Sequence, residues 1–115
     1  SLCTRPAAQR QAFRETAARG GGPLIALQHS PVRPPIESDY PFTPANAADM
    51  AADYEAAGVF LSLSGHYHPG RPLQAHGRTW YLTAAALCEP PHAYTLVTLH
   101  GRAVRMETRY LEERG

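Results

Sequence analysis

The fold is decided by the stretch LSLSGHYHPG at residues 61–70, where a short apolar run is followed by a glycine and two histidines. A continuous apolar run of this length is typical of a strand buried on both faces of a sheet. His66 and His68 are separated by one residue, so both imidazoles can face one cleft. Neutral imidazole is the commonest side-chain ligand of transition metals. The stretch therefore predicts a strand that brings two candidate ligands to a sheet edge.

A second apolar run, at residues 24–28, ends in the same way, because His29 follows it directly. It too has the pattern of a strand buried on both faces. A helix is expected between the two runs. Thr43 resembles an N-cap with Pro44 at the first helical position, and Gly58 suits a left-handed C-terminal stop. The order of elements is strand, helix, strand.

Such units are parallel and right-handed in nearly all proteins, so both strands end at the same edge of the sheet. Ligands of open α/β sheets bind at that edge. We therefore expect the rings of His29, His66 and His68 to converge there. A lone histidine after a strand is often only a hydrogen-bonded cap, and two loop histidines can also be surface groups. Because all three histidines are expected at the same sheet edge, we favour a metal site over these two alternatives.

The rest of the chain adds a first helix, a proline-rich loop and three further strands. The loop at residues 30–44 holds five prolines, and its Glu37 and Asp39 are more simply polar loop residues than ligands. Tyr67 either lines the cleft or packs on the sheet. The remaining histidines are expected to face solvent. The expected elements are a helix at 7–19 and strands at 79–84, 94–99 and 103–110, the last two joined by a hairpin turn, and the solvent-facing histidines are His76, His92 and His100.

The bulk composition excludes several classes of protein. The 115 residues fit a single domain, residues 1–115, and the net charge of +1 gives no basic field for nucleic acid. No apolar stretch approaches the roughly 20 residues that span a bilayer. Cys3 and Cys88 have no metal-ligand spacing, and reduced thiols point to a cytoplasmic protein. We expect neither a nucleic-acid nor a membrane partner.

The motifs resemble the C-terminal half of the calcineurin-like metallophosphoesterase superfamily. The resemblance lies in an apolar strand ending in His29-Ser30-Pro31, an excursion with a helix, and a strand ending in Gly65-His66-Tyr67-His68. It covers most of the chain, about residues 7–110. It implies an α/β fold that forms the C-terminal part of a four-layer αββα sandwich, with a mixed sheet, two helices and about five strands.

The resemblance also implies a chemistry. His29 and His66 would ligate one divalent ion and His68 a second, the ions being manganese, iron or zinc. The substrates would be phosphomonoesters or phosphodiesters, hydrolysed by a metal-bound hydroxide while both cations neutralise the phosphoryl oxygens.

The chain departs from this family in what it lacks. The earlier motifs Asp-x-His, Gly-Asp-x-x-Asp and Gly-Asn-His-Asp/Glu, which supply the bridging carboxylate and the remaining ligands, are absent. Three neutral imidazoles can hold one metal at most. We expect an enzyme fragment that is inactive alone and needs its N-terminal half. A non-catalytic phosphoesterase-like module and a single-zinc hydrolase are the alternatives. An uncovered apolar sheet face further predicts a homo-oligomer.

Overall fold

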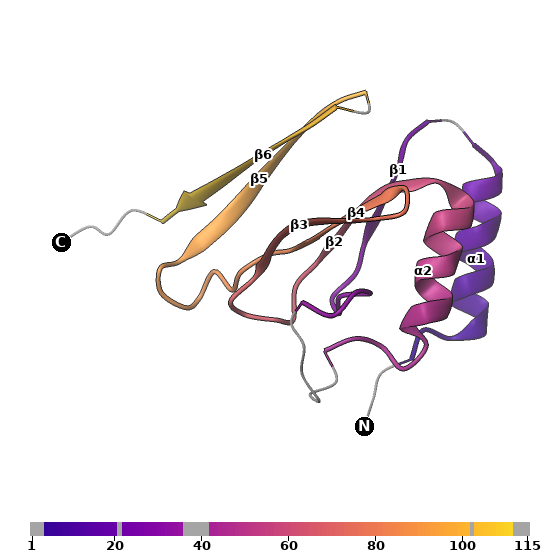
Figure 1. Ribbon diagram of the computed structural model, residues 1–115, viewed down its shortest axis with the longest axis horizontal. Helices are drawn as coiled ribbons and strands as arrows, with labels where there is room; N and C mark the ends of the chain where they lie inside the picture. The colour runs from indigo at the N-terminus through magenta and orange to yellow at the C-terminus, as the bar shows by residue number, and fades with distance from the viewer. Residues whose placement is uncertain (1–3, 21, 36–41, 102, 112–115) are drawn as a thin grey trace.

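The computed structural model describes residues 4–20, 22–35, 42–101 and 103–111. These ranges form a mixed α/β fold with a four-stranded mixed sheet, a separate two-stranded sheet and two helices (Figure 1). The elements are α1 (Ala7–Ala18), β1 (Leu24–Leu27), α2 (Ala47–Ala57), β2 (Val59–Ser64), β3 (Arg71–His76), β4 (Thr79–Thr83), β5 (Ala93–His100) and β6 (Ala103–Tyr110).

The larger sheet has the strand order β1-β2-β4-β3. β1 pairs with β2 in parallel, Leu27 lying opposite Leu63, which confirms the expected strand–helix–strand unit. β2 pairs with β4, also in parallel, with Ser64 opposite Thr83. β3 runs antiparallel to β4 at the far side. The C-terminal ends of three strands therefore meet at one edge of this sheet.

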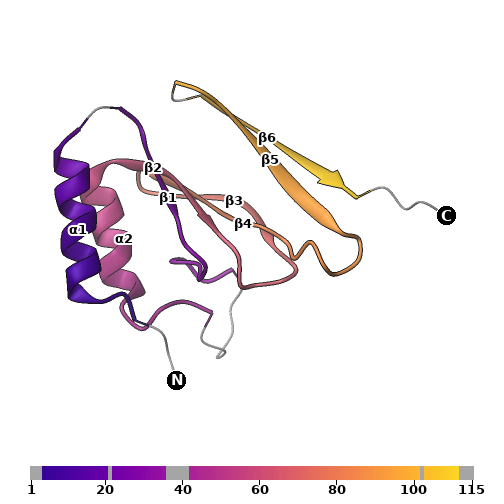
Figure 2. The same cartoon turned by 180° about the vertical axis from the view of Figure 1, so that it is seen from behind.

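Both helices cover one face of the sheet and form the core with it (Figures 1 and 2). Met50 and Tyr54 of α2 are almost fully buried against Val59 and Tyr81 of the strands. α1 contributes no fully buried residue. It is held through Phe13, whose ring centroid lies 5.3 Å from that of Tyr54. The core thus lies between α2 and the sheet.

The β5–β6 hairpin lies on the opposite face of the sheet from the helices (Figures 1 and 2). It covers that face only in part. Trp80 remains 49% exposed and Leu27 82% exposed. The prediction that the first strand is buried on both faces is therefore wrong for β1, because β1 is an end strand that the hairpin does not reach. The described residues form three layers, and the four-layer sandwich stays a prediction.

The expected start of the second helix was wrong. α2 begins at Ala47 rather than at Pro44, because the Pro44 carbonyl accepts a hydrogen bond from Ala47 N in a preceding turn (3.1 Å). Asn46 occupies the N-cap position, and its side chain pairs with the backbone N–H and carbonyl of Arg5. Gly58 does adopt the expected left-handed conformation, with φ 75°.

β3 was not predicted at all. Its first residues, Arg71 and Pro72, break the apolar pattern by which buried strands are identified. An edge position explains the composition, since proline is tolerated where its missing N–H faces no partner strand. Neither of the two described helices is both long enough and apolar enough to cross a lipid bilayer.

Candidate metal centre

The sheet edge at the C-terminal ends of β1 and β2 places two histidine segments side by side. Gln28 N donates to the Leu63 carbonyl (3.1 Å), which extends the parallel ladder beyond β1. Gly65 N then donates to the His29 carbonyl (2.8 Å). A Cβ at Gly65 would meet His29 atoms only at ordinary contact distance, so glycine is not sterically required there. The ladder itself positions His29 beside the turn that carries His66.

The imidazoles of His29 and His66 are in direct contact. Nε2 of His29 lies 3.2 Å from Nδ1 of His66, and the ring planes meet at 70°. Two nitrogens that each bind a metal at about 2.05 Å in tetrahedral geometry are roughly 3.3 Å apart. The same separation suits an N–H···N hydrogen bond in the absence of metal. The separation by itself is compatible with both arrangements.

The backbone at His66 is unusual. Its φ is 67°, in the left-handed region that non-glycine residues seldom enter. Tyr67 N donates to the Gly65 carbonyl (2.7 Å), so the chain turns sharply here. Such conformations cost roughly 1–3 kcal/mol and cluster at functional sites, where the surrounding structure enforces them. The turn directs the His66 ring toward His29.

His68 has a different partner. Its Nδ1 lies 2.6 Å from Oε1 of Glu89, and its carbonyl accepts a hydrogen bond from Ala86 N (2.9 Å). A histidine that donates Nδ1–H to a carboxylate presents Nε2 outward with a fixed ring orientation, as metal-binding histidines commonly do. Glu89 is therefore a functional candidate that the sequence did not reveal.

The place of Glu89 in the fold explains why the sequence did not reveal it. It follows β4, and β4 lies parallel to β2 in the sheet, so the segment after β4 reaches the same edge as the histidines. The sequence indicated the strand at 79–84 without showing that it pairs with β2.

The structure does not gather all three predicted ligands. Within residues 4–20, 22–35, 42–101 and 103–111, no three His, Cys, Asp or Glu side chains lie close enough together to hold a metal ion. The structure brings His29 and His66 together but does not add His68 to that pair. The assignment of all three as ligands stays a prediction. Glu37 and Asp39 lie outside the described residues.

Aromatic rings border the pair. The Phe42 ring centroid lies 4.9 Å from that of Tyr67 and 6.1 Å from that of His66. The observed ring contact of Tyr67 is with Phe42, a loop residue, and its two expected roles, lining the cleft or packing on the sheet, stay predictions. Tyr67 and Phe42 lie on one side of the turn at residues 65–70, which we call the histidine turn, and make that side apolar.

The other histidines have their own contacts. His76 pairs with Thr79 at the start of β4, which is the opposite edge of the sheet. It is half-buried rather than solvent-facing, and its pKa is lowered by burial and then by the charges of Arg33 and Arg71. His92 is likewise half-buried, with Nδ1 3.0 Å from the Leu87 carbonyl, whereas His100 is exposed as expected.

Comparison with known proteins adds no assignment: no family model matches the chain, and no curated protein matches it significantly.

Proposed function

We propose that this chain supplies part of the metal centre of a metal-dependent phosphoesterase. His29 and His66 bind one divalent ion, and His68 contributes to a second. The observation that carries the proposal is the 3.2 Å separation of two imidazole nitrogens delivered by two parallel strand ends. Manganese, iron and zinc all accept imidazole ligands.

The residues of the chain have distinct roles in this proposal. His29 offers Nε2 and His66 offers Nδ1, so each must carry its proton on the other ring nitrogen. Glu89 holds the proton of His68 at Nδ1 and leaves Nε2 as the donor atom. When bound, a divalent ion polarises phosphoryl oxygens and lowers the pKa of water. The rings of Phe42 and Tyr67 pack together beside the pair formed by His29 and His66.

A second polypeptide segment completes the centre in this account, because the histidines provide no bridging carboxylate. β1 is the docking edge that we propose for it. β1 is an end strand with apolar residues, including the exposed Ile25 and Leu27. The opposite end strand is protected by Arg71 and Pro72, as natural sheet edges usually are. An unprotected end strand invites pairing.

Apolar side chains on the larger sheet support an incomplete fold. Leu27 of β1 is 82% exposed and Trp80 of β4 is 49% exposed. We propose that the missing N-terminal half covers this apolar area and completes the four-layer sandwich.

The test is hydrolysis by the natural polypeptide that contains this chain. With Mn²⁺ present, p-nitrophenyl phosphate and bis(p-nitrophenyl) phosphate should be hydrolysed, and His29→Asn or His66→Asn should lower kcat/KM by at least about 100-fold. His100→Asn, an exposed hairpin residue, is the matched control. Unchanged hydrolysis in both site variants would refute the proposal and favour a non-catalytic module.

A further inference from the structure

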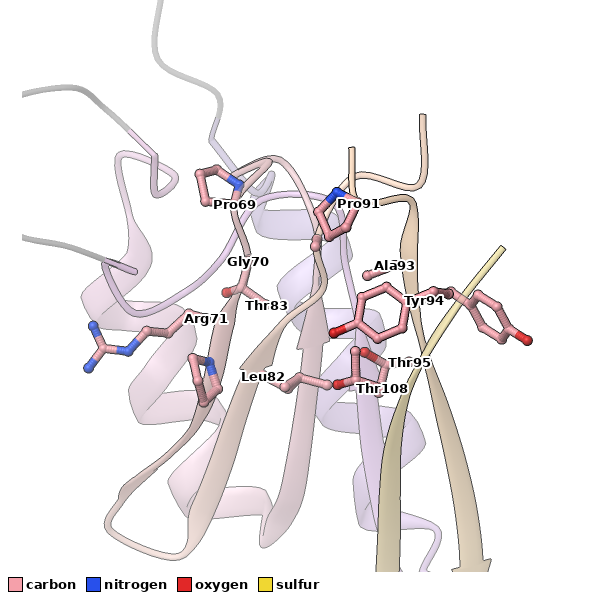
Figure 3. Close-up of a pocket in the computed structure, with 13 residues that line it drawn as sticks. Pro69, Gly70, Arg71, Leu82, Thr83, Pro91, Ala93, Tyr94, Thr95 and Thr108 are labelled. Carbon is pink, nitrogen blue, oxygen red and sulfur yellow. The ribbon is translucent and has the colours of Figure 1, made fainter. Parts of the chain in front are cut away.

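A cavity of about 320 Å³ lies between the end of β4 and the β5–β6 hairpin (Figure 3). Thr95 of β5 and Thr108 of β6 are register partners and face Leu82 of β4 across it. Pro72, Thr83, Ala85 and Ala93 also belong to its lining. Its volume falls within the range of small-molecule sites.

The cavity adjoins the candidate metal centre through two segments of chain. Pro69 follows His68 directly, and Pro91 lies two residues after Glu89. Both prolines line the cavity and stand at the same end of it in Figure 3. The hydrogen-bonded pair His68–Glu89 is therefore carried by the segments that form one end of the cavity.

The wall formed by the histidine turn is fixed in place. Gly70 has φ 74°, and a Cβ there would lie 2.9 Å from Ala85 N. The bond from Ala86 N to the His68 carbonyl joins the same two segments. This wall packs too closely against the residues after β4 to shift without breaking those contacts.

The lining is uncharged where a ligand would sit. Arg71 is the charged residue among the described lining residues, and its side chain points away from the cavity (Figure 3). Its Nη1 donates to the Pro35 carbonyl (2.7 Å). Threonine and tyrosine hydroxyls and apolar carbons remain, as on Thr95, Tyr94 and Leu82. Such a lining accepts a neutral ring or alkyl group with a hydroxyl, and disfavours a group that carries further phosphates.

We infer that this cavity receives the uncharged alcohol portion of the phosphoester substrate, with a compact aromatic alcohol as the best fit; the inference rests on the proposed phosphoesterase function. In the reaction, water forms one P–O bond and the P–O bond to the alcohol breaks. The departing alcohol oxygen takes up a proton that the water loses, which gives R–OH and phosphate. The released R–OH is then the cavity's ligand.

The experiment uses phenol as the probe and follows the backbone amides by NMR. Phenol should shift the amides of Thr95, Thr108 and Leu82 with a dissociation constant on the order of 1 mM. Benzoate, which adds a charge to the same ring, should bind at least about tenfold more weakly. Shifts confined to other regions would overturn the inference.

Cavity-filling variants sharpen the test. Thr95→Phe or Thr108→Phe should weaken phenol binding at least about fivefold. Thr98→Phe, on the outer face of β5, should leave it unchanged. Using both filling variants, each checked by circular dichroism, guards against a single misfolded protein. Equal phenol binding in all variants would overturn the inference.

The outcome is separable from that of the proposed function. His29→Ala should abolish metal binding and leave phenol binding intact, because His29 does not line the cavity. Metal binding without phenol binding would overturn only the cavity inference. Phenol binding without histidine-dependent metal binding would overturn the phosphoesterase assignment, and with it the role of the cavity.

Discussion

Nδ1 of His68 lies 2.6 Å from Oε1 of Glu89, although the two residues are 21 positions apart in the chain. Both side chains are more than half exposed. Because both side chains are exposed, this short contact contributes little to the packing of the core. It fixes the orientation of an imidazole at the edge where the sheet presents its other histidines.

Replacing Glu89 should therefore affect metal binding more than stability. If His68 is a ligand, Glu89→Gln should weaken its metal affinity about 10–100-fold, because outer-shell carboxylates fix the ring and raise its basicity. The melting temperature should change little for so exposed a residue. Calorimetric titration with Mn²⁺ or Zn²⁺ on the natural polypeptide measures the effect.

Glu107→Gln is the control for that experiment, since Glu107 is a hairpin carboxylate paired with Arg105 and Arg109. It should leave metal affinity unchanged. Equal affinities for the two variants would remove Glu89 from the site.

Gly70 should be the least replaceable glycine of the histidine turn. Gly70→Ala combines a left-handed φ with a Cβ that would lie 2.9 Å from Ala85 N. We expect it to destabilise the protein by at least about 1 kcal/mol more than Gly101→Ala. Gly101 has a similar φ of 59° but open space around it. Urea unfolding of the two variants makes the comparison, and equal losses would show that the wall can shift.

Asp53 should make the pairing of the two helices pH-dependent. Arg10 donates to its carboxylate (Nε to Oδ2, 2.9 Å), and this hydrogen bond lowers the pKa of Asp53 against the opposing effect of burial. Because the folded pKa is lowered, the stabilisation is complete above the unfolded pKa of about 3.9. It is lost as the pH falls through the lowered folded pKa.

Asp53→Asn should accordingly lower the melting temperature by a few degrees near neutral pH, and the difference from the parent should shrink as the pH falls below about 4. Asp49→Asn serves as the comparison, since Asp49 lies 3.8 Å from Arg10 and is well exposed. A difference that stays constant down to the acid transition would contradict the role assigned to Asp53.

The exposed apolar edge predicts self-association of the isolated chain. Leu27 is 82% exposed on end strand β1. Light scattering at micromolar concentration should show dimers or larger species, and Leu27→Lys should reduce them by placing a charge on the edge. Thr98→Lys, on the outer face of the hairpin, should leave the dimers or larger species unchanged. A monomeric parent chain would contradict this prediction.

The sequence predicted well what depends on local pattern. The apolar runs before His29 and His66 predicted two strands, and the helix between them predicted their parallel pairing. Gly58 marked the end of the intervening helix. These features follow from hydrophobic periodicity and from the conformational freedom of single residues, both of which can be read along a chain.

The sequence did not predict the features that depend on pairing between strands distant in the chain. β3 begins with Arg71 and Pro72, and only its edge position makes a strand there acceptable. The exposure of β1 could not be inferred from Ile25 and Leu27, because an apolar run does not show how much of its sheet is covered. Glu89 was missed because its approach to His68 depends on β4 pairing with β2.

The most direct test of the account is a calorimetric titration of this 115-residue chain with Zn²⁺ at neutral pH. We predict one ion per chain, bound through His29 and His66, with binding lost in His29→Ala and in His66→Ala and retained in His100→Ala. Binding that survives both site substitutions, or no binding by the parent chain, would contradict the assignment of these two imidazoles to a metal.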